Sequence, residues 1–244
     1  MDKIFLSVVI PAYNEESQIA STLNKTVDFL SGYGRAYEII VVDDGSKDNT
    51  YGIIKKFAAD SPRIIVLRSA GNQGKGTAVK NGVMAAQGEY VLFMDADFST
   101  PIDEVEDMLE FLMHDANYDF VIASRHAPGS RIVRREPPLR VLLGRVYHFI
   151  VAILFLRGIS DYNCGFKLYR RDVAKKLFGF MSSADYTFDV ELLYMAKKLG
   201  YRHKEMPVIW QHNPCSKVRP FLDSIKSLVS LAGIKLHTAL RRHK

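Results

Sequence analysis

The feature that most constrains this chain is an unbroken apolar run, residues 90–94, that leads directly into Asp95 and Asp97. A run of this kind is typical of a strand buried on both faces, because a half-exposed strand would alternate apolar with polar residues. In open α/β sheets, ligands bind beyond the carboxyl ends of the strands, where neighbouring loops diverge. The pattern therefore predicts a central strand that carries two carboxylates to the edge of a site.

An Asp-x-Asp pair at a strand end can hold Mg²⁺ or Mn²⁺, because these ions accept one or two protein carboxylates and complete their shell with water and substrate phosphate oxygens. The motif is short and arises often by chance. The alternative is a solvated turn before the helix expected to begin at Pro101. The surrounding sequence must decide between the two.

The rest of the chain alternates apolar runs with stretches of helical period. Strands are expected at residues 5–10, 37–42, 64–67 and 119–124. Helices are expected at 19–32, from the turn that ends at Asp48 to about residue 60, and at 77–87. This alternation predicts βαβ units and a mainly parallel sheet, so the fold class is α/β. Right-handed crossovers would place every strand exit on one edge.

Polar side chains follow two further strands of this expected sheet. Asn14 and Glu15 follow the first strand, and Asp43 and Asp44 follow the second. The glycine-rich segment 71–76 has neither the P-loop spacing nor the full GxGxxG pattern, which argues against an NTPase and a dinucleotide-binding dehydrogenase. Its Lys75, near a helix start, is a candidate for contacting a phosphate, with a solvated surface lysine as the alternative.

Composition limits the partners. The 244 residues suit one large α/β domain, and the net charge of +6 predicts an anionic partner: nucleic acid, a phosphorylated substrate or an acidic membrane surface. Nucleic acid is disfavoured, because the acidic strand exits would repel its backbone. Two distant cysteines indicate neither disulfides nor zinc, and no signal peptide is recognised, so a cytosolic compartment is expected.

Five segments together resemble the family 2 inverting glycosyltransferases of GT-A fold that load polyprenyl phosphates. They are Pro11-Ala12-Tyr13-Asn14-Glu15, Val41-Val42-Asp43-Asp44-Gly45-Ser46, Gly74-Lys75-Gly76, Asp95-Ala96-Asp97 and Cys164-Gly165-Phe166-Lys167. The chain is similar to the dolichyl-phosphate glucosyltransferases and mannosyltransferases of this family. The first four segments are shared across the wider nucleotide-sugar transferases, whereas the fifth narrows the resemblance to the polyprenyl-phosphate branch.

The resemblance implies a donor site for a nucleotide-sugar. The residues implied to hold the donor are Pro11, Tyr13, Glu15, Asp44, Lys75, Asp95, Ala96, Arg131 and Lys167. The implied metal ligands are Asp95, Asp97 and, through water, Ser99, which stands where the mannosyl enzymes have a glutamine. That departure favours UDP-glucose over GDP-mannose.

The resemblance also implies phosphate-handling groups at Arg125 and Lys217, beside Asp97 and Asp189 as catalytic candidates. Arg125 opens a run of arginines that could act as an anion funnel, because guanidinium groups bind phosphate through paired hydrogen bonds; its other members are Arg131, Arg134, Arg135, Arg140 and Arg145. Asp189 is expected to position the reacting phosphate, or to accept a proton if the acceptor is a hydroxyl. The alternative for Asp189 is a favourable charge at a helix start.

Two apolar segments flanked by basic residues complete the chain. Residues 146–156 are too short to cross a bilayer, which takes about 20 residues; the segment is either a core helix or a helix in the membrane interface. The resemblance favours the interface, for this helix (137–157) and for an amphipathic segment at 219–244, with a catalytic domain spanning 1–218. A peripheral enzyme on the cytoplasmic face of a membrane, bound to its anionic surface, is expected.

The expected reaction is therefore transfer of a hexose, glucose from UDP-glucose, to dolichyl or polyprenyl phosphate with inversion to a β-linked product, assisted by Mg²⁺ or Mn²⁺. The lipid phosphate is already ionised near neutral pH, so no strong general base is needed. Mannosyl transfer from GDP-mannose, and a family 2 transferase acting on a sugar hydroxyl, are the alternatives.

Overall fold

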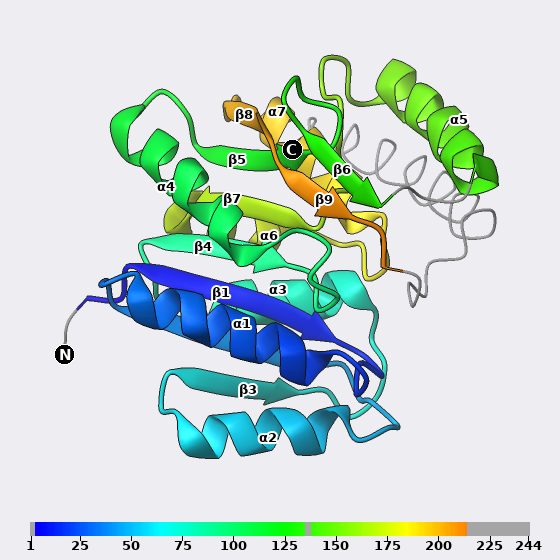
Figure 1. The fold of residues 1–244 in the computed structure, drawn as a ribbon. Coiled ribbons are helices and arrows are strands. Elements are labelled where there is room, and N and C mark those ends of the chain that lie inside the picture. The colour runs from blue at the N-terminus through cyan, green and yellow to red at the C-terminus, as the bar shows by residue number, and fades with distance from the viewer. Residues whose placement is uncertain (1–2, 135–137, 214–244) are drawn as a thin grey trace.

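The computed structural model describes residues 3–134 and 138–213, which form a seven-stranded mixed sheet between two layers of helices (Figure 1). The strand order is β3-β2-β1-β4-β7-β5-β8. The strands are β1 (Leu6–Ala12), β2 (Tyr37–Asp43), β3 (Ile64–Arg68), β4 (Tyr90–Met94), β5 (Phe120–Ser124), β7 (Phe166–Arg170) and β8 (His203–Pro207). The helices of the two layers are α1 (Ile19–Gly32), α2 (Thr50–Asp60), α3 (Lys75–Ala85), α4 (Val105–His114), α6 (Arg171–Phe180) and α7 (Phe188–Lys198), with a 3₁₀ turn at Ile102–Glu104. The α/β prediction is confirmed, and the strands expected from the apolar runs are present with ends shifted by one or two residues.

One strand runs against the others. Strands β1 to β4 are parallel, and β5 is parallel to β8, but β7 is antiparallel to both of its neighbours, β4 and β5. The prediction that every strand exit lies on one edge is therefore wrong for β7. Met94, at the carboxyl end of β4, pairs with Phe166, at the amino end of β7. As a result, the start of β7, and not its end, lies at the edge where β4 delivers its aspartates.

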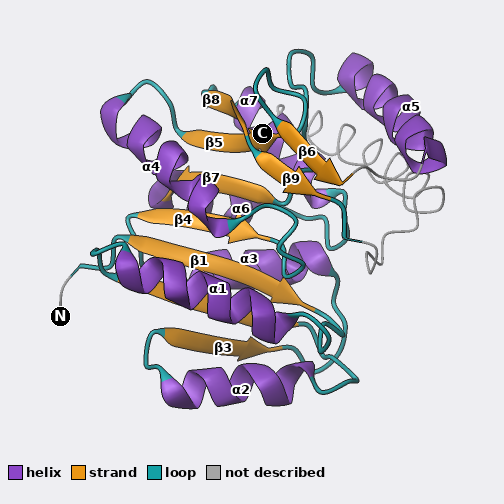
Figure 2. Ribbon diagram, viewed as in Figure 1, coloured by secondary structure: helices purple, strands orange, loops and turns teal. Residues whose placement is uncertain are grey.

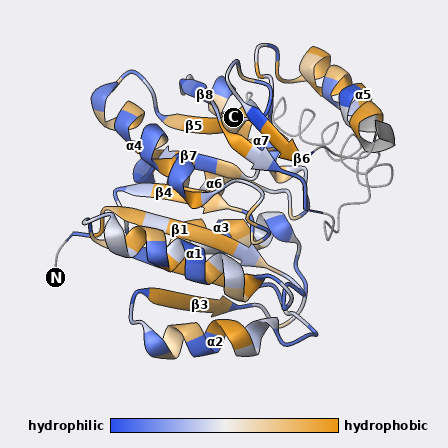
Figure 3. Cartoon of the chain, in the orientation of Figure 1, coloured by the Kyte–Doolittle hydropathy of each residue, from blue (hydrophilic) through white to orange (hydrophobic). Residues whose placement is uncertain are grey.

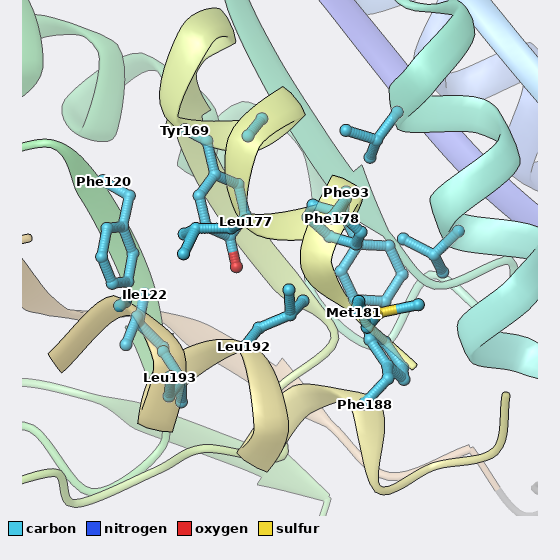
Figure 4. Close-up of a cluster of buried hydrophobic side chains, with 14 of the residues drawn as sticks. Phe93, Phe120, Ile122, Tyr169, Leu177, Phe178, Met181, Phe188, Leu192 and Leu193 are labelled. Atoms are coloured by element: carbon cyan, nitrogen blue, oxygen red, sulfur yellow. The ribbon is translucent and has the colours of Figure 1, made fainter. Parts of the chain in front are cut away.

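Helices cover both faces of the sheet (Figure 2), and each face has its own hydrophobic core. Side chains of α1, α2 and α4 pack on one face and those of α3, α6 and α7 on the other. Phe93 of β4 lies in the core that α3, α6 and α7 cover, edge-on to Phe188 of α7 with 5.7 Å between ring centroids (Figure 4). Because β1, β2 and β4 are buried on both faces, their continuous apolar runs are what this architecture requires.

A smaller unit lies beside the carboxyl edge of the sheet. Strands β6 (Arg131–Arg134) and β9 (Ile209–Gln211) pair in parallel, and helix α5 (Pro138–Leu154) lies near them (Figure 1). Of the described helices, none is both long and apolar enough to cross a membrane.

Helix α5 has two apolar faces with different surroundings. Tyr147 and Val151 are buried in the core that α3, α6 and α7 share. Phe149 and Ile153 are exposed by 65% and 52%, so the helix has exposed apolar side chains as well. Hydrophobic residues recur along α5 in the cartoon coloured by hydropathy (Figure 3). The core alternative is therefore confirmed for the face that carries Tyr147 and Val151. The interface alternative stays a prediction for the other face.

Candidate active site at the carboxyl edge of the sheet

The loop that follows β4 is held in place by backbone hydrogen bonds from distant parts of the chain. The N–H of Asp95 donates to the carbonyl of Gly165 at 3.0 Å. The Thr22 hydroxyl of α1 donates to the carbonyl of Ala96 at 2.6 Å, and the Gln211 N–H of β9 donates to the carbonyl of Ser99 at 2.9 Å. Asp95 and Asp97 are thus carried by a loop whose backbone is anchored on three sides.

Asp97 lies beside Asp95 in a partly desolvated setting. Burial raises the pKa of the Asp97 carboxyl, and the negative charge of Asp95 raises it further. The Ser99 N–H donates to Oδ1 of Asp97 at 2.9 Å, and Asn213 donates to the Asp97 carbonyl at 3.2 Å. Phe98, between Asp97 and Ser99 in the chain, has a φ of 54°, a region that few non-glycine residues adopt. Two neighbouring carboxylates in this setting favour a bound cation.

Lys75 supplies a positive charge beside Asp95. It is the first residue of α3, two residues earlier than predicted, and its Nζ lies 2.6 Å from Oδ1 of Asp95. Although burial opposes its charged form, Asp95 raises the pKa of Lys75. The N–H groups of Gly76 and Thr77 donate to the carbonyl of Ala184 at 2.7 and 3.4 Å. The first turn of this helix is therefore capped by a protein carbonyl, and its link to the site is the Lys75 side chain.

The exits of β1 and β2 are tied to each other. The Asn14 side chain accepts a hydrogen bond from the Lys47 N–H at 2.8 Å, and the Ser46 hydroxyl accepts one from the Asn14 N–H at 2.9 Å. Glu15 is fixed through its own N–H, which donates to the Thr50 hydroxyl at 2.7 Å. Pro11 is buried within β1, and Tyr13, just beyond it, is partly buried.

Asp44 has a structural partner that the sequence did not indicate. Its carboxylate is almost fully buried and accepts hydrogen bonds from the N–H groups of Gln73, at 3.0 and 3.1 Å, and Gly74, at 2.8 Å. Gly45 lies so close to Gly71 that a Cβ on Gly45 would overlap the Gly71 backbone. Asp44 therefore holds the glycine-rich segment against the exit of β2, and its predicted contact with the donor stays a prediction.

The start of β7 brings a buried ion pair to the same edge. Lys167 and Asp189 are exposed by 1% and 4%, and Nζ of Lys167 lies 2.5 Å from Oδ1 of Asp189. Nζ also donates to the Cys164 carbonyl at 2.7 Å. Burial raises the pKa of Asp189, whereas Lys167 opposes the rise. Asp189 does lie in the first turn of a helix, as predicted, but its carboxylate is committed to Lys167.

Arg125 follows β5 and is held by a residue that sequence reasoning missed. Its Nε and Nη2 donate to the two carboxylate oxygens of Asp161 at 2.7 and 2.9 Å. Asp161 is 2% exposed. Among the other arginines of the predicted funnel, Arg131 and Arg134 are exposed on β6 and Arg145 is exposed on α5. The side chains of Arg135 and Arg140, and all of Lys217 and 219–244, lie outside what the structure describes.

The described residues fit a metal site of a particular kind. Within residues 3–134 and 138–213, no three His, Cys, Asp or Glu side chains are grouped as a protein-only metal site. Asp95 and Asp97 are two neighbouring carboxylates, and the charge of Asp95 raises the pKa of Asp97. Such a pair suits an ion that takes its remaining ligands from water and a diphosphate. The predicted role of Ser99 is untested, and the Ser99 N–H is bonded to Asp97.

The structure thus brings five of the predicted residues together at one edge. Lys75, Asp95, Asp97, Lys167 and Asp189 interact electrostatically with one another. The residues that sequence reasoning missed are Thr22, Asp161, Asn213 and Glu205, whose carboxylate accepts a hydrogen bond from the Asp161 N–H at 2.9 Å. Asp161 stands four residues before Gly165, but nothing in the sequence connects it with Arg125.

This combination of a mixed sheet, helices on both faces and a carboxylate pair beyond the central strand defines the GT-A fold. Comparison of the structure with solved ones agrees. Mannosyl-3-phosphoglycerate synthase from Rubrobacter xylanophilus superposes with a TM-score of 0.74 at 20% identity, over 98% of this chain and 75% of that one. Glucosyl-3-phosphoglycerate synthase from Mycobacterium tuberculosis, solved with Mn²⁺ and UDP-glucose, gives a TM-score of 0.69 at 20% identity, over 95% and 79%.

Sequence comparison narrows the class further. Residues 7–178 match the family described as "Glycosyl transferase family 2", and the chain belongs to this family. It is 36% identical to the dolichyl-phosphate beta-glucosyltransferase of Dictyostelium discoideum, over 98% of this chain and 76% of that protein. The chain is therefore a hexosyltransferase.

Proposed function

We propose that this protein transfers glucose from UDP-glucose to dolichyl phosphate, or a related polyprenyl phosphate, with inversion to a β-linked lipid-phosphate sugar. The similarity to the Dictyostelium glucosyltransferase supports the choice of sugar and acceptor. The observation that carries the acceptor class concerns Asp189, whose carboxylate is buried and paired with Lys167. A phosphate acceptor needs no general base, whereas a sugar hydroxyl does.

In the proposed reaction, an oxygen of the lipid phosphate attacks the anomeric carbon as the bond from that carbon to the nucleoside diphosphate breaks. The acceptor arrives ionised, so no proton is transferred. The protein contributes alignment of the two reactants and positive charge near the departing diphosphate. Lys75 and Arg125 are described side chains suited to the second task, and Lys217 is proposed to join them.

Asp95 and Asp97 are proposed to hold Mg²⁺ or Mn²⁺, with Ser99 contributing through water. When bound, the ion supplies charge that stabilises the leaving diphosphate. The pairing of Lys75 with Asp95 would keep the carboxylate oriented before the donor arrives. Pro11, Tyr13, Glu15, Asp44, Ala96, Arg131 and Lys167 are proposed to shape the donor site, Asp44 through the glycine-rich segment that it holds.

The outward face of α5 supports a peripheral membrane location. Its exposed apolar side chains are Leu142, Val146, Phe149, Ile153 and Leu154, and Arg145 is exposed beside them. Apolar side chains interleaved with a basic one suit the interface of an anionic membrane. We propose that α5, together with the 219–244 segment, docks the catalytic domain on the cytoplasmic face, where a lipid phosphate would be presented.

The test is transfer of radiolabelled sugar from UDP-glucose, GDP-mannose and UDP-N-acetylglucosamine to a short polyprenyl phosphate, with and without Mn²⁺ or Mg²⁺. We expect metal-dependent labelling of the lipid from UDP-glucose, reduced at least about 100-fold in Asp97→Asn because the ion loses a ligand. Labelling from GDP-mannose alone would correct the sugar. Intact UDP binding without any lipid labelling would contradict the acceptor.

A further inference from the structure

Arg125 is held by several contacts at once. Three of its N–H groups donate to Asp161: the backbone N–H at 3.0 Å, Nε at 2.7 Å and Nη2 at 2.9 Å. The guanidinium group also lies over the Trp210 ring, 5.2 Å from its centroid. Paired hydrogen bonds along one edge fix the plane of the group and the direction in which its Nη1–Nη2 edge points.

Asp161 is itself fixed from behind. Its N–H donates to Oε1 of Glu205 at 2.9 Å, and the neighbouring Ser160 donates its N–H and hydroxyl to the same carboxylate at 3.0 and 2.8 Å. Glu205 belongs to β8, which pairs in parallel with β5, the strand that Arg125 follows. The sheet therefore supports both ends of the chain Glu205–Asp161–Arg125.

This arrangement lies next to the proposed site. Cys164 lies within electrostatic range of Arg125, of Asp161 and of Lys167. Gln211, next to Trp210, donates its N–H to Ser99 at 2.9 Å. The residues that hold Arg125 are thus continuous with both the β4 exit loop and the start of β7.

A buried ion pair of this kind adds little stability, because the cost of desolvating both charges offsets their attraction. Its effect is geometric. Although burial opposes ionisation, Arg125 lowers the pKa of Asp161 to about 2, so the pair stays charged throughout the neutral range. The guanidinium group is therefore oriented before any substrate arrives.

We propose that Asp161 is a positioning residue that aims Arg125 at a phosphate oxygen of the reaction, with Glu205 holding Asp161 in turn. This inference rests on the proposed function. The phosphate oxygen belongs to the donor diphosphate or to the lipid phosphate, and the two sources are separated by which substrate constant changes.

The test is steady-state kinetics of Asp161→Asn with the concentrations of UDP-glucose and of a short polyprenyl phosphate varied in turn. The amide has nearly the same shape but lacks the charge and offers an N–H where Arg125 needs an acceptor. We expect kcat/KM to fall on the order of 10- to 100-fold, the loss typical of a misplaced catalytic group. A raised KM for the lipid or for UDP-glucose would name the phosphate that Arg125 meets.

The matched control is Glu38→Gln. Glu38 is also a buried carboxylate that accepts hydrogen bonds, from Ser7 and from the Gln87 N–H, but it lies at the opposite edge of the sheet. We expect its kcat/KM to equal that of the wild type. In the Arg125→Ala background, Asp161→Asn should cost no further activity, whereas a purely structural role would lower activity there as well.

Calorimetric titration of the same variants with UDP and with the short polyprenyl phosphate distinguishes a failure of the proposed sugar transfer from a failure of the positioning role of Asp161. If the wild type transfers no sugar, the proposed function fails, yet Asp161→Asn should still weaken binding of one of the two phosphates. Wild-type kinetics and wild-type phosphate binding in Asp161→Asn would overturn the positioning role. An equal loss of activity with and without Arg125 would overturn it too.

Discussion

At the scale of single residues, Gly165 packs directly against the Asp95 side chain. Its carbonyl accepts the Asp95 N–H at 3.0 Å. A Cβ built on Gly165 would fall inside the van der Waals radius of the Asp95 carboxylate. The Cys-Gly-Phe-Lys segment therefore constrains the Asp-x-Asp loop by steric contact, although the two are about 70 residues apart in the chain.

Gly165→Ala should displace the Asp95 carboxylate and lower metal-dependent sugar transfer by on the order of 100-fold, since a shift of about 1 Å at a reacting centre has that effect. The measurements are kcat/KM and the affinity for Mn²⁺ with UDP. Gly179→Ala is the control, because a Cβ there meets nothing within 4 Å. That change should leave transfer intact and, in helix α6, stabilise the fold by up to about 1 kcal/mol. Wild-type activity in Gly165→Ala would show that Asp95 tolerates the displacement.

At the scale of elements, α5 divides its apolar residues between two environments. Tyr147 and Val151 pack into the core, whereas Phe149 and Ile153 point away from it. Hydrophobic periodicity predicted a helix here but left its surroundings open, because an apolar stripe looks the same whether protein or lipid covers it.

The double substitution Phe149→Ser with Ile153→Ser should release the protein from anionic vesicles without unfolding it. Burial of a large apolar side chain contributes about 1.5–3 kcal/mol, so losing two should weaken vesicle binding by at least about 100-fold. Flotation on vesicles rich in acidic lipid measures this. Phe180→Ser, which removes an exposed apolar side chain of α6, is the control and should not change flotation. Equal flotation of all three proteins would mean that α5 is not the docking face.

At the scale of the whole molecule, the Lys167–Asp189 pair joins the sheet to a helix of the covering layer. The pair is almost fully buried between β7 and α7. Removing one partner of such a pair leaves the other charge buried and unpaired, which costs about 3–5 kcal/mol of unfolding free energy. Replacing both partners with apolar groups costs much less.

Lys167→Met should therefore destabilise the fold by about 3–5 kcal/mol in urea unfolding, and Lys167→Met with Asp189→Leu by less. The deficit of the single variant should depend on pH. Burial raises the pKa of Asp189 in the folded state, and loss of Lys167 removes the charge that opposes the rise. A group with a raised folded pKa binds more protons when folded, so stability increases as pH falls. The deficit should shrink between about pH 8 and about pH 5; a constant deficit would contradict a stranded Asp189 charge.

Local patterns in the sequence were sufficient to predict the α/β class, the parallel strands β1 to β4 and the polar residues at their exits. Burial on both faces of a strand leaves an unbroken apolar run, and the crossover connection fixes the edge to which its end is delivered. Asp95 and Asp97 at the edge of the sheet follow from these two rules alone.

Only the tertiary structure decided that β7 enters the sheet antiparallel between β4 and β5, which places Gly165 against Asp95 and brings Lys167 to Asp189. The same holds for Asp161, whose pairing with Arg125 joins residues 36 positions apart. Strand partners and ion pairs depend on contacts between distant segments, and no periodicity in the chain records them. The sequence alone was thus sufficient to name the candidate residues, whereas the partners that orient them could be found only from the tertiary structure.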